Sequence, residues 1–346
     1  MPGGAAVLRR LLAAGLVSEA EVVDGDVSLR DVSRSNSVYL VSAGGRAPVV
    51  AKACLGERPA GQGDPAVERA FYRALAVNGV GPADLPVAGT VAVGADLLVL
   101  GAIEGATTVE LRMRAEGPSG ALACLLGAAL GRWRAVADDL DWSDLDLPVS
   151  SPWVLTVATP DEPPFVAQYP ALTRMARAVA DEPGLRRRLA ELRDGWRLRG
   201  VIHGDVRWDN ALVVGDRVVL VDWEFADWGD PAWDVAGAVA DALVYAVLPL
   251  DVAHRDGLLA PEALGRLCGS LDWFFGRFAS AYATAYGAPA ASDLEAGGHL
   301  VPARLVQNAF QLAAHEGASG MECGLALVGL AASLSGQPDL LSRWLG

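Results

Sequence analysis

Short apolar runs and longer helical periodicities predict a strand-rich N-terminal part followed by helices. β-Branched runs over Ser37–Val41 and Ala47–Ala53, separated by a Gly-Gly turn, predict a pair of strands, and Asp96–Leu100 predicts another. Leu147–Pro170 is rich in Pro and Ser and predicts a loop. Apolar residues at helical spacing predict helices over Pro65–Ala76, Ala121–Ala137, Leu172–Leu192, Val235–Val247, Leu264–Tyr286, Leu300–His315 and Met321–Leu334.

The first twenty residues combine Arg9 and Arg10 with a short apolar stretch. Such a segment is compatible with a signal peptide or a twin-arginine signal, but the stretch is short and acidic residues follow it directly. We therefore expect an amphipathic helix here. No segment has the run of about 18 apolar residues that is typical of a membrane span, so we expect no membrane partner.

A polar loop carries the clearest chemical signal of the chain. Arg199–Ile202 predicts a short strand that leads into the segment His203–Asn210, in which Asp205 and Asn210 lie five residues apart. Phosphoryl transfer from a nucleotide requires one carboxylate for the incoming hydroxyl group and an Asn/Asp pair to hold magnesium on the phosphates. The loop supplies the first carboxylate and the Asn.

The second carboxylate follows a predicted hairpin. The β-rich runs 211–214 and 218–221 flank Gly215-Asp216, a hairpin turn signal, and Asp222 comes directly after the second run. Asn210 and Asp222 then flank one small hairpin and face the same metal site. Few other chemistries require this order of residues, so the pattern predicts a kinase reaction.

Two further positions belong to this pattern. Asp234 lies at the start of the predicted helix Val235–Val247, where it either caps the helix or accepts backbone hydrogen bonds from the polar loop. Lys52 ends an apolar strand, where an ammonium group is costly unless it is paired. The candidate partner is Glu68 in the next helix, and this pair would position the nucleotide phosphates. The alternative is a strand-end Lys that reaches solvent and an exposed Glu.

These motifs resemble the aminoglycoside/choline phosphotransferases, which share the bilobal protein-kinase-like fold. The matching segments are His203-Gly204-Asp205 with Asn210, Asp222-Trp223-Glu224, and Gly229-Asp230-Pro231 with Asp234. The resemblance implies an α+β fold with a small β-rich N-lobe and a mainly helical C-lobe. It also implies that Asp205 is the catalytic base, that Asn210 and Asp222 bind Mg²⁺, and that His203 and Asp234 are structural supports.

The chain departs from the family pattern in the loop, where Trp208-Asp209 replaces a common Pro-Gly. Arg207 follows Asp205 by two residues, and protein kinases that modify Ser/Thr carry a Lys there. A guanidinium group at this position would neutralise charge on the transferred γ-phosphoryl group. The alternative is an Arg that only forms surface ion pairs.

The resemblance also implies a nucleotide lobe over residues 1–100, a hinge at 101–105 and a catalytic and acceptor-binding lobe over 106–346. A Gly-rich phosphate loop is absent before Lys52, and Ser35, Asn36 and Ser37 resemble the Ser/Asn loop that covers the phosphates in this family. We expect ATP and Mg²⁺ as cofactors, although the sequence leaves GTP open.

Composition narrows the environment and the partners. The chain has 346 residues and a formal net charge of −14, which argues against a nucleic-acid partner because such a partner requires a basic surface. Four cysteines are scattered singly, which is typical of reduced thiols in a cytoplasmic enzyme, and we expect no zinc or iron. The acidic balance is compatible with a cationic acceptor.

Several candidates remain, both for the residues that contact the acceptor and for the acceptor itself. Trp208 could stack against it or shield the loop from water, and Glu224, Asp227 and Asp230 lie near enough in sequence to contact it. The chain also resembles, more weakly, the kinase-like subunits of lanthipeptide and thioamide-peptide pathways. That resemblance implies phosphorylation of Ser/Thr in a ribosomally made peptide, with a separate lyase subunit as partner, and we favour it slightly. The alternatives are a kinase for an aminoglycoside-type antibiotic or an amino alcohol, and a pseudokinase or binding subunit without transfer.

Overall fold

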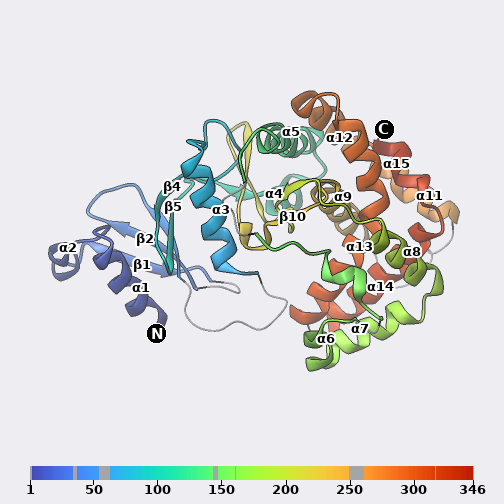
Figure 1. The fold of residues 1–346 in the computed structure, drawn as a ribbon, viewed down its shortest axis with the longest axis horizontal. Helices are drawn as coiled ribbons and strands as arrows, with labels where there is room; N and C mark the ends of the chain where they lie inside the picture. Colours follow the sequence, from blue (N-terminus) through green and yellow to red (C-terminus); the bar gives the residue numbers. More distant parts are fainter. Residues whose placement is uncertain are drawn as a thin grey trace.

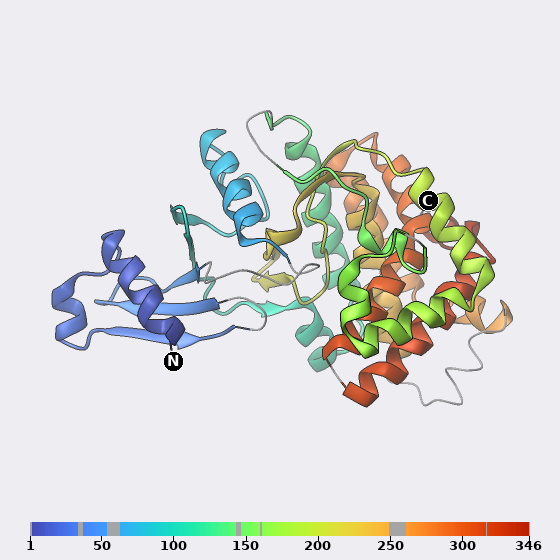
Figure 2. The same cartoon turned by 60° about the horizontal axis from the view of Figure 1, so that its bottom comes forward.

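The computed structural model describes residues 2–33, 37–53, 63–142, 147–159, 161–248, 261–315 and 317–345. They form two lobes that lie side by side (Figure 1), with the N-terminal sheet at one end and most helices at the other (Figure 2). The predicted α+β class, with a small β-rich N-terminal lobe and a mainly helical C-terminal lobe, is confirmed.

The N-terminal lobe is built on one antiparallel sheet with the strand order β1-β2-β3-β5-β4. Three helices accompany it: α1 (Pro2–Ala13), α2 (Glu19–Val23) and α3 (Pro65–Val77). The predicted N-terminal helix is therefore present. The strands are β1 (Val27–Asp31), β2 (Ser37–Ala43), β3 (Val49–Ala53), β4 (Thr90–Val93) and β5 (Leu97–Gly101).

The two faces of the sheet pack against different helices, because side chains alternate along a strand. Leu97 and Val99 of β5 belong to a core cluster with Val7 and Leu11 of α1. Leu98 and Leu100 belong instead to the main core, which includes Phe71, Tyr72 and Leu75 of α3. Helix α3 starts locally for two reasons: the Asp64 side chain accepts from the Ala66 backbone N–H, and Pro65 occupies the first turn.

Strand register places the one lysine of the chain on the α3 side. Lys52 of β3 lies directly opposite Leu98 of β5, and opposite residues of an antiparallel pair point to the same face. Glu68 occupies the buried face of α3 together with Phe71, Tyr72 and Leu75. The pairing of β3 with β5 therefore brings the ammonium group to the helix that carries its predicted partner.

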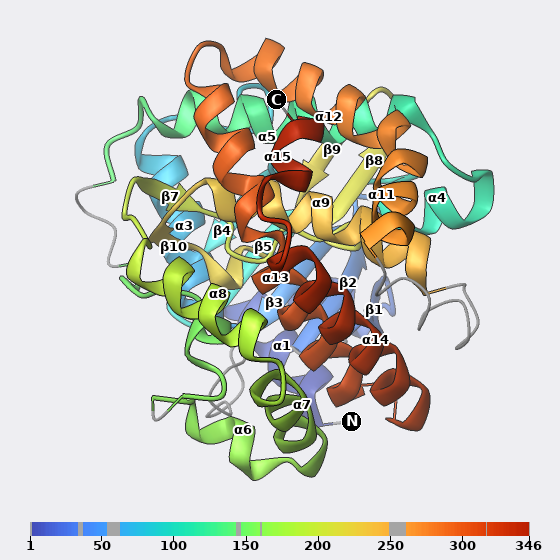
Figure 3. The same ribbon diagram turned by 90° about the vertical axis from the view of Figure 1, so that its right-hand side faces the viewer.

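The C-terminal lobe is a helical assembly that carries two small antiparallel sheets, β6-β8-β9 and β7-β10. Helices α12, α13, α14 and α15 lie on the face turned to the viewer in Figure 3. The small strands are β6 (Thr107–Thr108), β7 (Gly200–Ile202), β8 (Ala211–Val214), β9 (Arg217–Leu220) and β10 (Asp227–Gly229). The helices are α4 (Val109–Glu116), α5 (Gly120–Ala137), η1 (Trp153–Thr156), α6 (Pro164–Gln168), α7 (Pro170–Ala180), α8 (Pro183–Asp194), η2 (Trp223–Phe225), α9 (Ala232–Val247), α11 (Pro261–Ser270), α12 (Asp272–Tyr286), α13 (Ala290–His315), α14 (Gly317–Ser335) and α15 (Asp339–Leu345).

Helix α5 is the one helix among the described residues that is long and apolar enough to cross a membrane. More than half of it, 56%, is buried inside the structure, and its neighbours include α12. A helix that is apolar over most of its circumference is also what a protein core requires.

Several boundaries differ from the sequence-based expectation. The predicted loop Leu147–Pro170 contains η1 and α6, because Phe165, Val166 and Val154 are buried in the core. The single pattern over Leu172–Leu192 is divided between α7 and α8. Helix α13 begins ten residues before the predicted Leu300 and contains Pro302 in its interior. The proposed division at 101–105 stays a prediction; in the structure β5 ends at Gly101 and the next strand, β6, pairs with β8.

The contact between α5 and α12 depends on small residues. A side chain at Gly127 would meet the backbone of Phe278, whereas a side chain at Gly276, on the exposed face of α12, would meet nothing. We expect Gly127→Ala to lower the free energy of unfolding by about 1–3 kcal/mol, as overpacking does. The matched change Gly276→Ala should raise it by about 0.5–1 kcal/mol through helix propensity. Urea denaturation of the two variants measures both signs, and equal effects would contradict the packing argument.

Candidate active site

The loop between β7 and β8 brings Asp205 and Asn210 together. Both residues are buried. The Asn210 Nδ2 atom donates to the Asp205 backbone oxygen at 3.0 Å and lies 3.3 Å from Asp205 Oδ2. The side-chain amide of Asn210 thus holds the candidate base in place through both its main chain and its carboxylate.

The start of the loop is held by Asp234 at the beginning of α9. Its carboxylate accepts from the His203 backbone N–H at 2.8 Å and from the Gly204 N–H at 3.0 Å. Burial raises the pKa of Asp234, while the backbone N–H groups of His203 and Gly204 and the charge of Arg304 oppose that shift. Of the two roles considered for Asp234, the structure has the one in which it binds the loop backbone.

His203 is a buried neutral residue that joins the loop to the hairpin. Its Nε2 atom lies 2.9 Å from the Val221 backbone oxygen, and the Asp205 N–H donates to its Nδ1 at 3.3 Å. These contacts assign the proton to Nε2, because Nδ1 must accept. Burial lowers the pKa of His203, which agrees with the neutral form.

Asp222 lies two residues after the end of β9, in the left-handed region with φ 64° and ψ 58°. Its neighbour Trp223 is fully buried and stacks on Phe71 of α3, with ring centroids 4.0 Å apart and planes 9° from parallel. Trp223 also packs against Trp133 and His203. The aromatic cluster thus fixes the turn that presents Asp222.

Lys52 forms a buried ion pair with Glu68, with Nζ 2.7 and 2.9 Å from the two carboxylate oxygens. It also pairs with Asp222. Burial alone would lower the pKa of Lys52, but the charges of Glu68 and Asp222 raise it above its ordinary value. Burial likewise opposes ionisation of Asp222, yet Lys52 lowers the pKa of Asp222. The predicted strand–helix pair is present and extends to the C-terminal lobe.

Asn210 and Asp222 fit a magnesium ion by donor type and position. The Val221 N–H donates to the Asn210 backbone oxygen at 3.0 Å, so the two residues are neighbours at the open end of the hairpin. An amide oxygen and a carboxylate are hard donors, and Mg²⁺ is usually held by one or two protein groups together with phosphate oxygens and water. In the described part of the chain, no group of three or more His, Cys, Asp or Glu side chains could hold a metal.

The Arg207 guanidinium group contacts three side chains. Its Nε lies 3.3 Å from Asp205 Oδ2, one terminal nitrogen lies 3.2 Å from Asp209 Oδ2, and the other donates to Gln311 Oε1 at 3.2 Å. The charge of Asp205 is the main cause that raises the pKa of Arg207. Arg207 therefore contacts the candidate base directly, and its role toward the γ-phosphoryl group stays a prediction.

Trp208 lacks the exposed ring face that stacking against an acceptor requires. The side chain is only 2% exposed, its indole N–H donates to the Ala238 oxygen at 3.2 Å, and its ring packs on Tyr245 and Phe274. It fills the space between α9 and α12 and has no free face for an acceptor. Of the two roles considered for Trp208, shielding of the loop agrees with this geometry.

The three acidic acceptor candidates differ in availability. Asp230 is buried, pairs with Arg199 at 2.7 Å and accepts from the Ala232 N–H at the start of α9, so it is engaged in the fold. Asp227 is half-buried and accepts from the Ser150 hydroxyl at 2.8 Å, and burial raises its pKa. The Glu224 backbone oxygen accepts from the Asp64 N–H. Burial raises the pKa of Glu68, and the charge of the Glu224 carboxylate adds to that shift.

The predicted phosphate-covering segment is only partly described. Ser35 and Asn36 lie outside the described residues. Ser37 is the first residue of β2 and pairs with Ala53, one residue beyond Lys52 in β3. Their contact with phosphates stays a prediction.

Sequence reasoning missed the polar residues beneath the loop. Asp241 of α9 accepts from the Trp208 N–H at 2.6 Å and from Asn308 Nδ2 at 3.0 Å. Arg304 of α13 is fully buried and donates to the Gly204 and Val206 oxygens at 3.1 and 2.8 Å. The available signal was the recurrence of polar residues along one face of an otherwise apolar helix.

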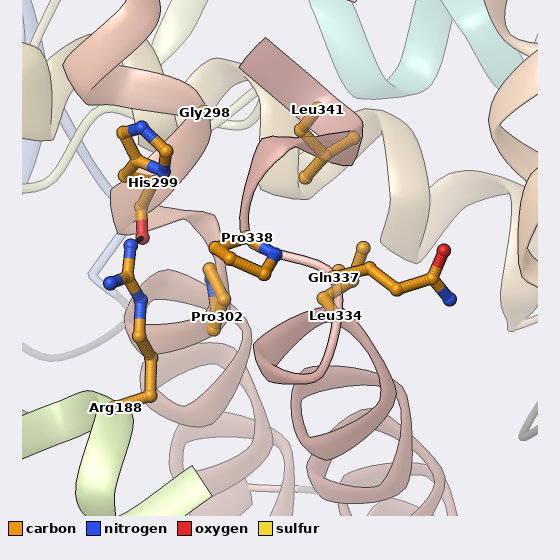
Figure 4. Close-up of a pocket in the computed structure, with 8 residues that line it drawn as sticks. All are labelled: Arg188, Gly298, His299, Pro302, Leu334, Gln337, Pro338 and Leu341. Atoms are coloured by element: carbon orange, nitrogen blue, oxygen red, sulfur yellow. Dashed lines mark hydrogen bonds between the residues drawn. The ribbon is translucent and has the colours of Figure 1, made fainter. Parts of the chain in front are cut away.

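Two concave regions lie outside this site. A small cavity of about 10 Å³ lies beside Pro302. Figure 4 shows the residues that line it, among which Arg188 donates to the His299 backbone oxygen. A groove of about 430 Å³ is bordered by Arg114, Tyr245 and Trp273. None of the predicted site residues lines either region.

Comparisons with known proteins concern the family and the fold. The sequence profile described as "APH: Phosphotransferase enzyme family" matches residues 26–294. None of the curated proteins matches the chain. Three solved structures illustrate the likeness in fold.

The amicoumacin kinase hAmiN in complex with AMP-PNP, Ca²⁺ and Ami is 15% identical, with a TM-score of 0.55 over 87% of this chain and 88% of that chain. The Plasmodium vivax ethanolamine kinase is 11% identical, with a TM-score of 0.56 over 96% and 88%. A thermostable mutant of the aminoglycoside phosphotransferase APH(4)-Ia, in ternary complex with ADP and hygromycin B, is 14% identical, with a TM-score of 0.50 over 94% and 98%. At these identities the likeness concerns the fold alone.

The carboxyl group of Asp241 gives a pH-dependent prediction. Burial raises the pKa of Asp241 to about 7; Asp209 adds to the shift, and the Trp208 N–H, Arg207 and Arg304 oppose it. Between the ordinary pKa and about 7 the folded protein holds a proton that the unfolded chain has released. The contribution of Asp241 to stability therefore falls as pH rises through this range.

We expect Asp241→Asn to show a smaller decrease in the free energy of unfolding between pH 4.5 and 7 than the wild type. Denaturant titrations at several pH values measure this slope. Asp216→Asn, at the exposed hairpin turn, is the matched control and should keep the wild-type slope. An unchanged slope in Asp241→Asn would show that this carboxyl group does not titrate as the structure implies.

Proposed function

This chain belongs to the APH phosphotransferase enzyme family, and we propose that it transfers the γ-phosphoryl group of MgATP to a hydroxyl group of a small-molecule acceptor. The observation that carries the proposal is the convergence of Asp205, Asn210, Asp222 and Lys52 where the two lobes meet. The motif-based resemblance to aminoglycoside/choline phosphotransferases is confirmed at the level of the family.

The side chains divide the work as follows. Lys52, steadied by Glu68, binds phosphate oxygens of the nucleotide. Asn210 and Asp222 hold the magnesium ion, which neutralises phosphate charge when it is bound. Asp205 orients the acceptor hydroxyl and accepts its proton as the oxygen attacks the γ-phosphorus, and the bond from that phosphorus to the bridging oxygen breaks to release ADP.

The contacts of these side chains are compatible with this division of roles. Lys52 pairs with Asp222, so phosphate oxygens bound by Lys52 would lie close to a metal held by Asp222. Asn210 uses its NH₂ group toward Asp205, and its amide oxygen, a separate acceptor, would serve the same metal.

A small-molecule acceptor is better supported than a peptide. The three structures named above concern ethanolamine and two antibiotics, and no peptide substrate appears among them. The slight preference for Ser/Thr of a ribosomally made peptide therefore yields to the alternative, an antibiotic or an amino alcohol. A partner lyase subunit is not needed for this function. A cytoplasmic location remains part of the proposal.

Nucleotide binding is tested first by calorimetric titration of MgATP and MgGTP into the wild type. We expect MgATP to bind, and we expect Asp222→Ala to lose the magnesium-dependent part of that binding. Asp216→Ala, the exposed Asp of the same hairpin, should bind like the wild type. A folded wild type that binds neither nucleotide would overturn the kinase proposal.

Transfer is tested by ADP release in the presence of amino alcohols, aminoglycosides and a Ser/Thr-rich peptide, each followed by mass spectrometry. We expect an added mass of one phosphate on a small molecule, and we expect Asp205→Asn to lower turnover by about two orders of magnitude or more. Full activity of Asp205→Asn would exclude it as the base. Nucleotide binding without transfer to any acceptor would favour the pseudokinase alternative.

A further inference from the structure

Helix α13 carries a row of polar side chains on the face that lies under the catalytic loop. Arg304, Gln307, Asn308 and Gln311 follow one another at i, i+3, i+4 and i+7, the spacing that places residues on one side of a helix. The first three are at least 93% buried. Buried polar groups are costly unless they are hydrogen-bonded, so the partners of this α13 polar row explain why it exists.

The partners of the α13 polar row are successive residues of the catalytic loop. Arg304 donates to the Gly204 and Val206 oxygens. Gln307 Nε2 lies 3.4 Å from Asp205 Oδ1, and Gln311 Oε1 accepts from Arg207. Asn308 reaches the loop indirectly, through Asp241, which accepts from the Trp208 N–H.

The loop backbone comes so close to α9, the helix on the other side of the loop from α13, that α9 requires a glycine there. A side chain at Gly237 of α9 would meet both the Val206 oxygen and the Arg304 guanidinium group. The loop backbone therefore lies between α9 and α13 with no space for an added methyl group. Such packing leaves the loop little freedom except in the side chains of Asp205 and Arg207, which the two glutamines contact.

The two glutamines use opposite ends of their amides, and chemistry assigns the ends. Gln307 lies between a carboxylate, Asp205 Oδ1, and a donor, Arg304, whose terminal nitrogen is 3.1 Å from Gln307 Oε1. Its NH₂ group must therefore face Asp205. Gln311 faces a guanidinium nitrogen of Arg207 and must present its oxygen.

We propose that Gln307 and Gln311 are the positioning residues of the transfer reaction: Gln307 orients the Asp205 carboxylate by donating to Oδ1, and Gln311 orients Arg207 by accepting from its guanidinium group. This inference rests on the proposed function, in which Asp205 is the base. With Oδ1 facing Gln307, Oδ2, which lies 3.3 Å from the Arg207 Nε, is the oxygen that accepts the hydroxyl proton.

The same substitution should have opposite outcomes at the two positions. Gln307→Glu keeps an oxygen for Arg304 but removes the donor to Asp205 and adds a negative charge beside it. We expect turnover to fall at least about tenfold, with little change in the KM for MgATP, because misplacement of a reacting group affects the chemical step. Gln311→Glu keeps the oxygen for Arg207 and should retain turnover within about threefold.

The experiment measures ADP release with the acceptor found in the screen, or with water as the acceptor if ATP hydrolysis is faster than transfer to any compound of the screen. The melting temperature of each variant is measured as well. Gln307→Met and Gln311→Met remove both ends of each amide and should both lower turnover. Gln168→Met, on the exposed face of α6, is the matched control and should behave like the wild type. Amide hydrogen exchange of residues 204–209 in the ligand-free variants reports loop order without any turnover.

The outcomes separate the inference from the function on which it rests. If the only role of Gln307 were to accept the hydrogen bond from Arg304, Gln307→Glu would have the melting temperature and the turnover of the wild type, in contrast to Gln307→Met. That result would overturn the inference. Wild-type turnover in both Gln307 variants, alongside an inactive Asp205→Asn, would overturn it while leaving the proposed function intact. If Asp205→Asn were as active as the wild type, the proposed function itself would fail. In the absence of any turnover, unchanged exchange at 204–209 in Gln307→Met and Gln311→Met would also overturn the inference.

Discussion

The buried ammonium group of Lys52 is the constraint on which the rest of this structure depends. It has a carboxylate partner from each lobe, Glu68 on α3 and Asp222 after β9. A buried charge that lost these partners would cost several kcal/mol, so the sheet, α3 and the hairpin are most stable when assembled together. The aromatic packing reinforces the same junction, because Trp223 follows Asp222 and stacks on Phe71, one turn after Glu68. Charge pairing and apolar packing thus fix the same interlobe geometry.

The catalytic loop is held by a second set of contacts, which come from helices later in the chain. Asp234 of α9 accepts the first two loop N–H groups, and Arg304 of α13 donates to two loop oxygens. The loop therefore has few groups left to reorganise during a reaction, which is the property that makes preorganised sites effective. Under the proposed function, the ionic junction positions the groups that bind the nucleotide, and the helical support positions the group that activates the acceptor. The two sets meet at His203, whose ring bonds the Val221 oxygen and packs on Trp223.

The sequence predicted features that depend on local spacing, and it failed where partners are remote. The loop, the hairpin and the strand–helix pair have fixed offsets, and the structure brings Asp205, Asn210 and Asp222 together with Lys52 and Glu68. The α13 polar row was not recognised, because its partners lie about 100 residues earlier in the chain. Trp208 was left open because a Trp within a polar loop has no local feature that distinguishes burial from exposure. Ser35 and Asn36 lie outside the described residues, so their role still rests on the resemblance alone.

The two candidate metal ligands also connect the ionic junction to the loop. Asp222 pairs with Lys52, and the Asn210 NH₂ group donates to the Asp205 backbone oxygen and lies 3.3 Å from Asp205 Oδ2. The amide oxygen of Asn210 is a separate acceptor, so under the proposed function this residue would serve the metal and the base at the same time. Asp222 would likewise hold the metal while Lys52 kept its pair with Glu68. The residues that would bind the metal are therefore also the ones that position the candidate base, so a displaced metal site would displace that base as well.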